Sequence, residues 1–331
     1  MRVEGRAFAR AGVLGNPSDG YFGKIIAVSV KNFSAEVKLE ESDALRILTP
    51  AQEINTFDSL EDLVGGVSLY GYYGGVRLVK AGIKRFYDHC LDREIRLADR
   101  NFSLTFSSNI PRQLGLGGSS AIITAVIQAL TAFYEVEIPE PILPTLILEA
   151  ERDELGINAG FMDRVIQVFE GCVFMDLDRE VILSRGYGRY ERLDPDSLPP
   201  LYLAYKPGLG KVSGRVLNPI RESFEQGDPA VLGTLRRLAE LAEEGKAALL
   251  RRDQGRLRTL MDENFDLRSR IMTISEENLS LIKAARDCGA SAKFAGSGGS
   301  LIGMYEDEGM FTELTRVLGE LQAVVLKPVV V

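Results

Sequence analysis

The chain has 331 residues, of which 45% are hydrophobic and 26% charged, and its formal net charge is -8. This length predicts about two domains, and the composition is that of a globular protein rather than a disordered or membrane chain. The acidic charge argues against nucleic-acid and anionic-membrane partners, because both require a basic surface. It leaves an anionic substrate open, since a local cluster of basic groups can outweigh distant negative charge.

The cysteines and the single histidine narrow the chemistry further. The three cysteines, Cys90, Cys172 and Cys288, are far apart and form no Cys-x-x-Cys pair, so we expect neither a disulfide framework nor a zinc site, and a reducing cytoplasm fits best. No apolar run reaches the roughly 18 residues of a membrane span, and the N-terminus lacks a signal-peptide core. With His89 alone, a Ser-His-Asp triad is disfavoured and a general base is expected to be a carboxylate.

The first hundred residues predict a small sheet with flanking helices. Strands are expected at 3–8, 24–33, 35–39, 45–48 and 101–107, and helices at 58–63 and 76–90. Arg10 lies in the apolar part of the segment that leads into a turn ending near Gly20, where its guanidinium needs an anionic partner. The glycine-rich segment 65–75 carries Tyr70, Tyr72 and Tyr73, which form either one wall of an adenine pocket or a plain aromatic cluster.

A glycine- and serine-rich stretch, Pro111 to Ala121, directly precedes an apolar helical run at 122–133. A strand, a glycine loop and a helix follow one another in the order that a phosphate site needs. The first amides of a helix have no partner within it and lie at the positive end of its dipole. The alternative is a simple turn with a serine N-cap. The candidate phosphate-binding residues are Gly115, Leu116, Gly117, Gly118, Ser119, Ser120 and Ala121.

Carboxylates follow on the next two predicted helices. Glu149 and Glu151 lie two residues apart near the end of the first, so they cannot share one helical face. Asp163 stands at the head of the second, after a glycine turn. An aspartate there is ordinarily a cap or a partner of the helix dipole. Strands are then expected at 171–176, 181–183 and 201–205.

The run Asp-Pro-Asp-Ser-Leu-Pro-Pro at 194–200 predicts the boundary between two domains, 1–195 and 196–331. A basic glycine-rich loop is expected at 207–215, and a second glycine turn lies between two short strands within 292–304. This order of helices, hairpin, helix and strand predicts a ferredoxin-like second lobe. The remaining elements are amphipathic helices at 230–250, 256–271, 276–287 and 310–321, and a strand at 323–331.

Three separated glycine motifs, at 10–20, 111–121 and 296–299, resemble those of the GHMP kinases, the family of galactokinase, homoserine kinase and mevalonate kinase. The middle one is similar to the family's Pro-x-x-x-Gly-Leu-Gly-Ser-Ser-Ala loop, with one additional glycine before Ser119. The resemblance implies an α+β, two-lobed fold: an N-terminal α/β lobe with the glycine phosphate loop, and a C-terminal ferredoxin-like lobe. It also implies ATP and Mg²⁺ as cofactors.

The same resemblance implies roles for individual residues. Ser120 and Glu151 correspond to the ligands of Mg²⁺, and Asp163 to the catalytic carboxylate. Arg10 corresponds to the residue that assists the reacting hydroxyl. The positions that correspond to the family's substrate side, with the late turn that closes over the active site, are Asp19, Gly296, Ser297 and Gly298.

At closer range, segments 10–24, 110–113, 118–122, 163–168 and 208–214 resemble the glucuronokinase branch of this family. That implies phosphorylation of D-glucuronate by ATP at its anomeric oxygen, giving glucuronate 1-phosphate. The alternatives are another kinase of the family, acting on a neutral sugar, a sugar phosphate or an isoprenoid alcohol, and a non-catalytic relative that keeps the fold for binding. A uronic acid calls for a basic reader of its carboxylate, and the candidates are Arg164, Lys24, Arg112, Lys211 and Arg215.

Overall fold

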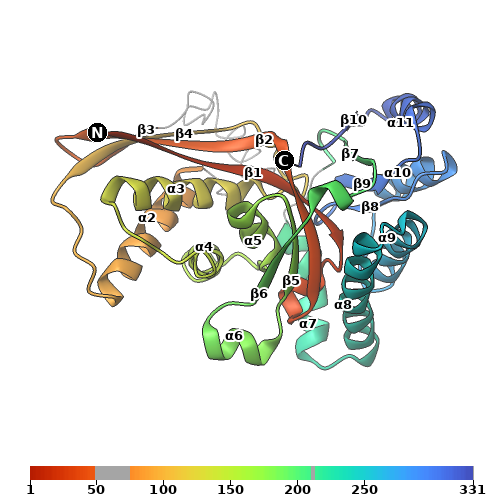
Figure 1. The fold of residues 1–331 in the computed structure, drawn as a ribbon, viewed down its shortest axis with the longest axis horizontal. Helices are drawn as coiled ribbons and strands as arrows, with labels where there is room; N and C mark the ends of the chain where they lie inside the picture. The colour runs from red at the N-terminus through yellow and green to blue at the C-terminus, as the bar shows by residue number, and fades with distance from the viewer. Residues whose placement is uncertain (49–74, 210–212, 331) are drawn as a thin grey trace, which may run out of the picture.

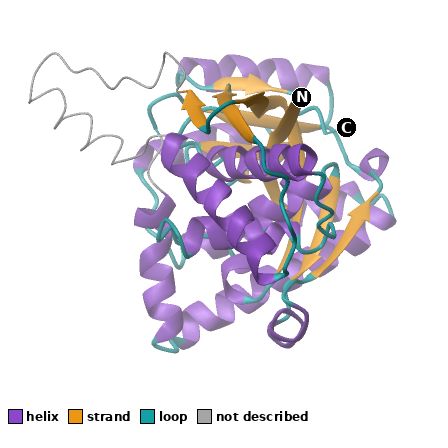
Figure 2. Cartoon of the chain, turned by 90° about the vertical axis from the view of Figure 1, so that its left-hand side faces the viewer, coloured by secondary structure: helices purple, strands orange, loops and turns teal. Residues whose placement is uncertain are grey.

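The computed structural model describes residues 1–48, 75–209 and 213–330, with backbone alone for 213–217. Figure 1 shows the elements of the first half of the chain around two long strands, and those of the last third on the other side of the molecule. In the view at 90°, helices pack around a layer of strands (Figure 2). Within these ranges, no helix combines the length and the hydropathy that a membrane span requires.

The first sheet is built on two long antiparallel strands, β1 (Arg2–Leu14) and β2 (Lys24–Ser42). Strand β2 also pairs with β4 near its end and with β5 near its start, and short β3 runs parallel to β4. The other strands of this sheet are β3 (Arg46–Leu48), β4 (Asn101–Ser108), β5 (Cys172–Asp176) and β6 (Arg189–Leu193).

The burial of side chains changes along β1, and the change marks the part of the strand that carries Arg10. Up to Phe8 its residues alternate between buried and more exposed, as expected for a strand with one covered face. From Ala9 to Leu14 every residue is buried, so both faces of the strand are covered there. Arg10 lies in this fully covered part, which is where a charged side chain needs a partner most.

The helices of the first half pack mainly on one face of this sheet. Helix α3 (Gly118–Tyr134) buries ten of its residues and lies against β1, β2 and α2. The others are α2 (Gly75–Asp92), α4 (Leu143–Arg152), α5 (Met162–Phe169) and α6 (Arg179–Arg185), with 3-10 turns η1 (Ser18–Tyr21) and η2 (Pro195–Ser197).

The second sheet has the spatial order β10-β7-β9-β8, with all pairs antiparallel. In chain order these are the fourth, first, third and second strands of the lobe, the arrangement of a ferredoxin-like fold, so that prediction is confirmed. The strands are β7 (Leu201–Tyr205), β8 (Lys293–Phe294), β9 (Ser300–Met304) and β10 (Val324–Leu326). The helices are α7 (Ser213–Glu225), α8 (Pro229–Leu250), α9 (Gln254–Ser269), α10 (Glu276–Asp287) and α11 (Glu308–Glu320).

A single buried cluster joins the two halves. Leu241 of α8 and Leu260 of α9 belong to the same hydrophobic core as Leu14 and Val28 of the first sheet. Apolar burial of this kind is the main favourable term in folding, so it holds the second lobe against the first. The division of the chain near residue 195 stays a prediction.

The structure differs from the expectations in five places. The segment 181–183 is not a strand but part of α6, which begins after Asp178, whose carboxylate accepts the Val181 amide at 3.1 Å. Strand β6 was not predicted. Segments 24–33 and 35–39 form one continuous strand, and β1 extends through the first half of the predicted turn. The loop expected at 207–215 gives way to α7 at Ser213, while the helix expected at 58–63 and Tyr70, Tyr72 and Tyr73 lie outside the described residues.

Candidate active site

The glycine loop reaches α3 through two residues with left-handed backbone conformation. Gly115 has φ 63° and Gly117 has φ 77°, and Gly117 is the residue that precedes the helix, with no side-chain cap. Such angles cost little only for glycine. The simple serine N-cap is therefore the wrong interpretation of this stretch. The N-terminus of a buried 17-residue helix opens instead from a glycine turn, as anion binding requires.

The late glycine turn packs directly against this loop. The Ser300 hydroxyl donates to the Leu114 carbonyl at 2.6 Å, and a Cβ added at Gly115 would lie 2.7 Å from the Ser297 nitrogen. The Gly12 amide, in β1, donates to the Ala295 carbonyl at 2.8 Å. All three glycine motifs thus meet at one place, although about 180 residues separate the second from the third in sequence.

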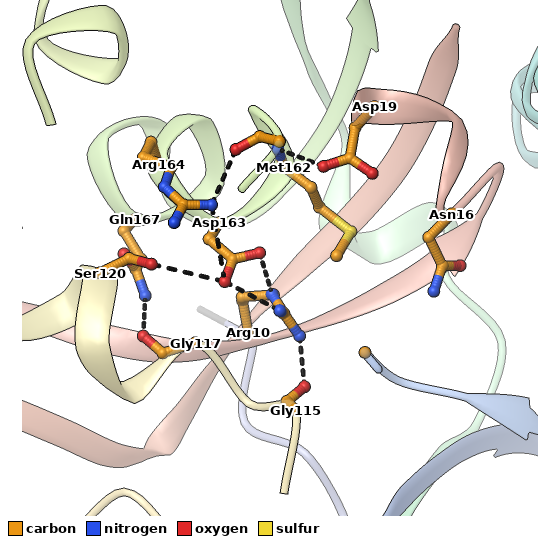
Figure 3. A network of polar contacts seen from close by, with 12 residues as sticks. Arg10, Asn16, Asp19, Gly115, Gly117, Ser120, Met162, Asp163, Arg164 and Gln167 are labelled. Carbon is orange, nitrogen blue, oxygen red and sulfur yellow. Dashed lines mark hydrogen bonds and ion pairs between the residues drawn. The ribbon is translucent and has the colours of Figure 1, made fainter. Parts of the chain in front are cut away.

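Arg10 and Asp163 form a bidentate ion pair where the three glycine motifs meet (Figure 3). The Arg10 Nε donates to Asp163 Oδ1 at 2.7 Å and Nη2 donates to Oδ2 at 2.9 Å. The Nη1 group donates to the carbonyls of Gly115 and Ala295. Four of the five N–H groups of a guanidinium are thereby used. The anionic partner expected for Arg10 is Asp163, and the pair holds that carboxylate beside the glycine loop.

Ser120 and Glu151 lie on the other side of Asp163. The Ser120 hydroxyl is 3.3 Å from each carboxylate oxygen of Glu151 and 3.5 Å from Asp163 Oδ2. Glu151 is 1% exposed and forms an ion pair with Arg164, which also donates to the Gly160 carbonyl at 2.7 Å. Glu149, by contrast, faces away and binds Arg85, so the expected separation of the two glutamates is confirmed.

This set of oxygen atoms fits Mg²⁺. The ion is hard, prefers oxygen ligands and is usually held by one or two protein groups together with substrate phosphates. A hydroxyl and a carboxylate, Ser120 and Glu151, lie together at the start of α3, beside the loop suited to phosphate. Among the described residues, no group of three or more His, Cys, Asp or Glu side chains is placed to hold a metal ion.

Asp19 joins the same cluster from η1. Its Oδ2 accepts the backbone N–H of Met162, the neighbour of Asp163, at 3.2 Å. Burial, and after it the nearby negative charge of Asp163, raise the pKa of Asp19 to about 6, against the opposing effects of this hydrogen bond and of Arg10. A carboxyl group with a raised pKa next to a second carboxylate is typical of functional sites.

Two buried cations beneath the late glycine turn were not predicted. The Lys293 ammonium donates to the Gly12 carbonyl at 2.6 Å, to Asn16 Oδ1 at 2.7 Å and to the Phe294 carbonyl at 2.9 Å. Arg268 donates to the Gly296 carbonyl at 2.6 Å. Burial lowers the pKa of Lys293 well below its ordinary value and that of Arg268 to about 10. Their partners are backbone and amide oxygens, which leave no pattern in the sequence.

The basic residues that were candidates for binding a substrate carboxylate differ in whether a protein carboxylate already pairs with them. Lys24 forms an ion pair with Glu243, on α8, and Arg164 is held by Glu151. Arg112 is exposed in the loop before Gly115, on the phosphate side. Lys211 and the side chain of Arg215 lie outside the part of the chain that the structure describes.

Comparison with known proteins places this arrangement among kinases. Residues 77–171 match the GHMP kinases N terminal domain, and residues 246–320 match GHMP kinases C terminal. Probable glucuronokinase 2 from Arabidopsis thaliana is 45% identical over 306 residues, covering 90% of this chain and 83% of that protein. Glucuronokinase 1 from the same plant is 43% identical over 91% of this chain and 84% of its own length. The structure of Lactococcus lactis galactokinase complexed with galactose superimposes with a TM-score of 0.78 at 16% identity, covering 100% of this chain and 94% of the other, a likeness of fold.

Proposed function

The chain belongs to the GHMP kinases and is an ATP-dependent kinase, and from this premise we propose that its substrate is D-glucuronate. The reaction transfers the γ-phosphoryl group of ATP to the anomeric hydroxyl and gives glucuronate 1-phosphate and ADP. The observation that carries the choice of sugar is the 43–45% identity to two glucuronokinases over most of both chains.

Asp163 is the residue that we assign to the sugar hydroxyl. Its carboxylate lies between the glycine loop and Asp19, held by two hydrogen bonds from Arg10. In this position it can accept the proton of the anomeric hydroxyl or orient that hydroxyl for attack. With the two contacts of Nη1 to carbonyls, Arg10 keeps one N–H, on Nη2, and we assign it to stabilising negative charge on the attacking oxygen.

The phosphate groups of ATP are assigned to the glycine loop and the N-terminus of α3, residues 115–121. Phosphoryl transfer demands mainly positioning and charge stabilisation, and backbone amides at a helix start supply both. Ser120 and Glu151 would hold Mg²⁺. When bound, this ion would neutralise charge on the phosphates and help to orient them. Arg164 keeps the Glu151 carboxylate in place, and Gly296, Ser297 and Gly298 are assigned to the second wall of the site.

A coupled assay of ADP release tests the substrate. We expect turnover with D-glucuronate and much lower kcat/KM with galactose, a heptose phosphate or mevalonate. A clear preference for one of these others would reject glucuronate and leave the family assignment intact. No magnesium-dependent ADP release with any of them would favour a non-catalytic binding protein.

The Asp163→Asn variant tests the site. Because the amide cannot accept the proton and pairs poorly with Arg10, we expect kcat to fall by about 10²–10⁴-fold, while ATP still binds. Asp99, exposed and far along the chain, provides a matched control as Asp99→Asn, which should keep full activity. Unchanged turnover of the Asp163 variant would refute its assignment.

We also propose that the protein works in the cytoplasm without nucleic-acid partners. The support is the net charge of -8 and the three cysteines, which are all free, as a reducing compartment requires.

A further inference from the structure

We propose that Arg221, on α7, binds the carboxylate of the sugar and so selects a uronic acid over a neutral hexose. This rests on the proposed function, since it names the group that recognises the acidic part of that substrate. None of the five basic residues singled out in the sequence is Arg221, and it is found only through its place in the fold.

Arg221 reaches the substrate side of the site from the second lobe. Its Nη2 donates to the Gly20 carbonyl at 3.4 Å and to Asn158 Oδ1 at 3.1 Å. Gly20 directly follows Asp19, and Asn158 lies in the turn that leads to α5 and Asp163. The guanidinium thus touches both segments that carry the site's aspartates.

The orientation of this guanidinium is fixed by neutral groups. Its centre lies 5.2 Å from the centroid of the Tyr21 ring, which in turn packs on Phe224 at 4.9 Å. The side chain of Asn158 is anchored to α7 by a hydrogen bond from its Nδ2 to Asn218 Oδ1 at 3.1 Å. Because these contacts already hold the guanidinium in one orientation, it loses little conformational entropy when a ligand binds.

Within the described part of the chain, Arg221 is also a cation with no anionic hydrogen-bond partner. Among the residues that the structure describes, none of its bonds goes to a carboxylate, and both bonds come from Nη2. The N–H groups of Nε and Nη1 have no hydrogen-bond partner among the described residues, and we assign them to the ligand. A partly buried guanidinium with neutral partners gains most from an incoming carboxylate, because a bidentate, charge-assisted pair is roughly twice as strong as a neutral hydrogen bond.

The other cations near the aspartates do not meet this need. Arg10 and Arg164 are already paired with Asp163 and Glu151. Lys293 and Arg268 are at most 1% exposed and are bound to protein carbonyls, so a ligand cannot reach them. Arg221 keeps part of its surface in contact with solvent.

The position suits the shape of the sugar. In the ring form of a hexuronic acid, the anomeric carbon and the carbon that bears the carboxylate are the two neighbours of the ring oxygen, so the two functional groups are attached on either side of that oxygen. Asp19 contacts the Met162 amide on one side and precedes Gly20 on the other. Asp19 is thus in contact with the residue before Asp163, to which we assign the anomeric hydroxyl, and is adjacent in sequence to the carbonyl that Arg221 binds.

The test compares D-glucuronate with D-glucuronamide, whose neutral amide has the same shape. For Arg221→Met we expect kcat/KM for glucuronate to fall about 30- to 300-fold, the loss of a charge-assisted hydrogen-bonded pair. The value for glucuronamide should change less than about threefold. Arg221→Lys keeps the positive charge but lacks the two parallel N–H donors of the guanidinium, and should recover part of the preference for glucuronate over glucuronamide. Arg236→Met, at an exposed position of α8, is the control that should leave both values unchanged.

The outcomes separate this proposal from the proposed function. Equal losses with both substrates, or an unchanged preference for glucuronate, would overturn the role of Arg221 while glucuronate remains the substrate. If the wild type phosphorylates neither compound but accepts another substrate of the family, the proposed function fails and takes this proposal with it. Melting temperatures identify a variant that fails to fold, and the lysine variant then decides.

Discussion

Asp19 should make the folded protein less stable at neutral pH than it would be with an uncharged residue there. Its pKa is raised from 3.8 to about 6, first by burial and then by repulsion from Asp163. A carboxyl group whose pKa is higher in the folded than in the unfolded chain binds its proton more tightly when folded. Between the two pKa values, stability therefore falls as the pH rises.

The magnitude follows from the size of the shift. A difference of about 2 units corresponds to about 3 kcal/mol at 1.36 kcal/mol per unit. Because Asp19 is not fully shielded from solvent, we expect between about 2 and 3 kcal/mol. The full cost is present above about pH 7 and disappears below about pH 4. Asp19→Asn removes the charge and keeps an oxygen to accept the Met162 amide.

Urea unfolding at pH 4.5, 6 and 7.5 measures this term. We expect Asp19→Asn to be more stable than the wild type by about 2–3 kcal/mol at pH 7.5, and the difference to shrink to about 1 kcal/mol at pH 4.5. The variant should bind glucuronate poorly, so stability and activity change in opposite directions. Asp99→Asn should show no such pH dependence. A variant that is less stable than the wild type at pH 7.5, or a difference independent of pH, would refute the reasoning.

Two further predictions concern the metal ligand and the buried lysine. Ser120→Ala should lower kcat by about 10²-fold and raise the Mg²⁺ concentration that gives the half-maximal rate. Ser119→Ala should have a smaller effect on both quantities, because the hydroxyl of Ser120 is the one beside Glu151. Equal effects of the two variants in a magnesium titration would contradict this. Lys293→Met should lower the free energy of unfolding by about 2–4 kcal/mol, because three buried oxygens lose their donor. A urea midpoint equal to that of the wild type would contradict this and would show that removal of the buried charge offsets the lost hydrogen bonds.

The elements that the sequence predicts well are those with a strong local pattern. Helix α3 has an apolar run with glycine before it, and the second lobe has long amphipathic helices whose order indicates its topology. The error at 181–183 has a clear cause, because Val181, Ile182 and Leu183 favour strands locally. Asp178 caps a helix there, and Leu183 stays 73% exposed. Short apolar runs do not distinguish the two structures.

The sequence indicates which carboxylates and which glycine motifs belong to the candidate site. It does not indicate which arginine pairs with which carboxylate. That Arg10 needs an anionic partner follows from its apolar surroundings, yet which carboxylate serves is decided by β1 and α5 meeting in space. Arg164 was expected on the substrate side, and the structure places it against Glu151 instead; its substrate role remains a prediction. Arg221 stands in a polar helix, where one more arginine carries no signal.

The buried cations explain how the second lobe orients the late glycine turn. Lys293, Arg10 and Arg268 donate to three successive carbonyls, those of residues 294, 295 and 296. In a trans peptide the C=O and N–H groups point in opposite directions, so carbonyls held toward these cations turn the amides of Gly296 and Ser297 the other way. The close approach of Gly115 to the Ser297 nitrogen indicates that this other way is toward the glycine loop. Lys293 and Arg268, which have no assigned contact with the substrate, would thus help Arg10 to turn a second row of N–H donors toward the place assigned to phosphate.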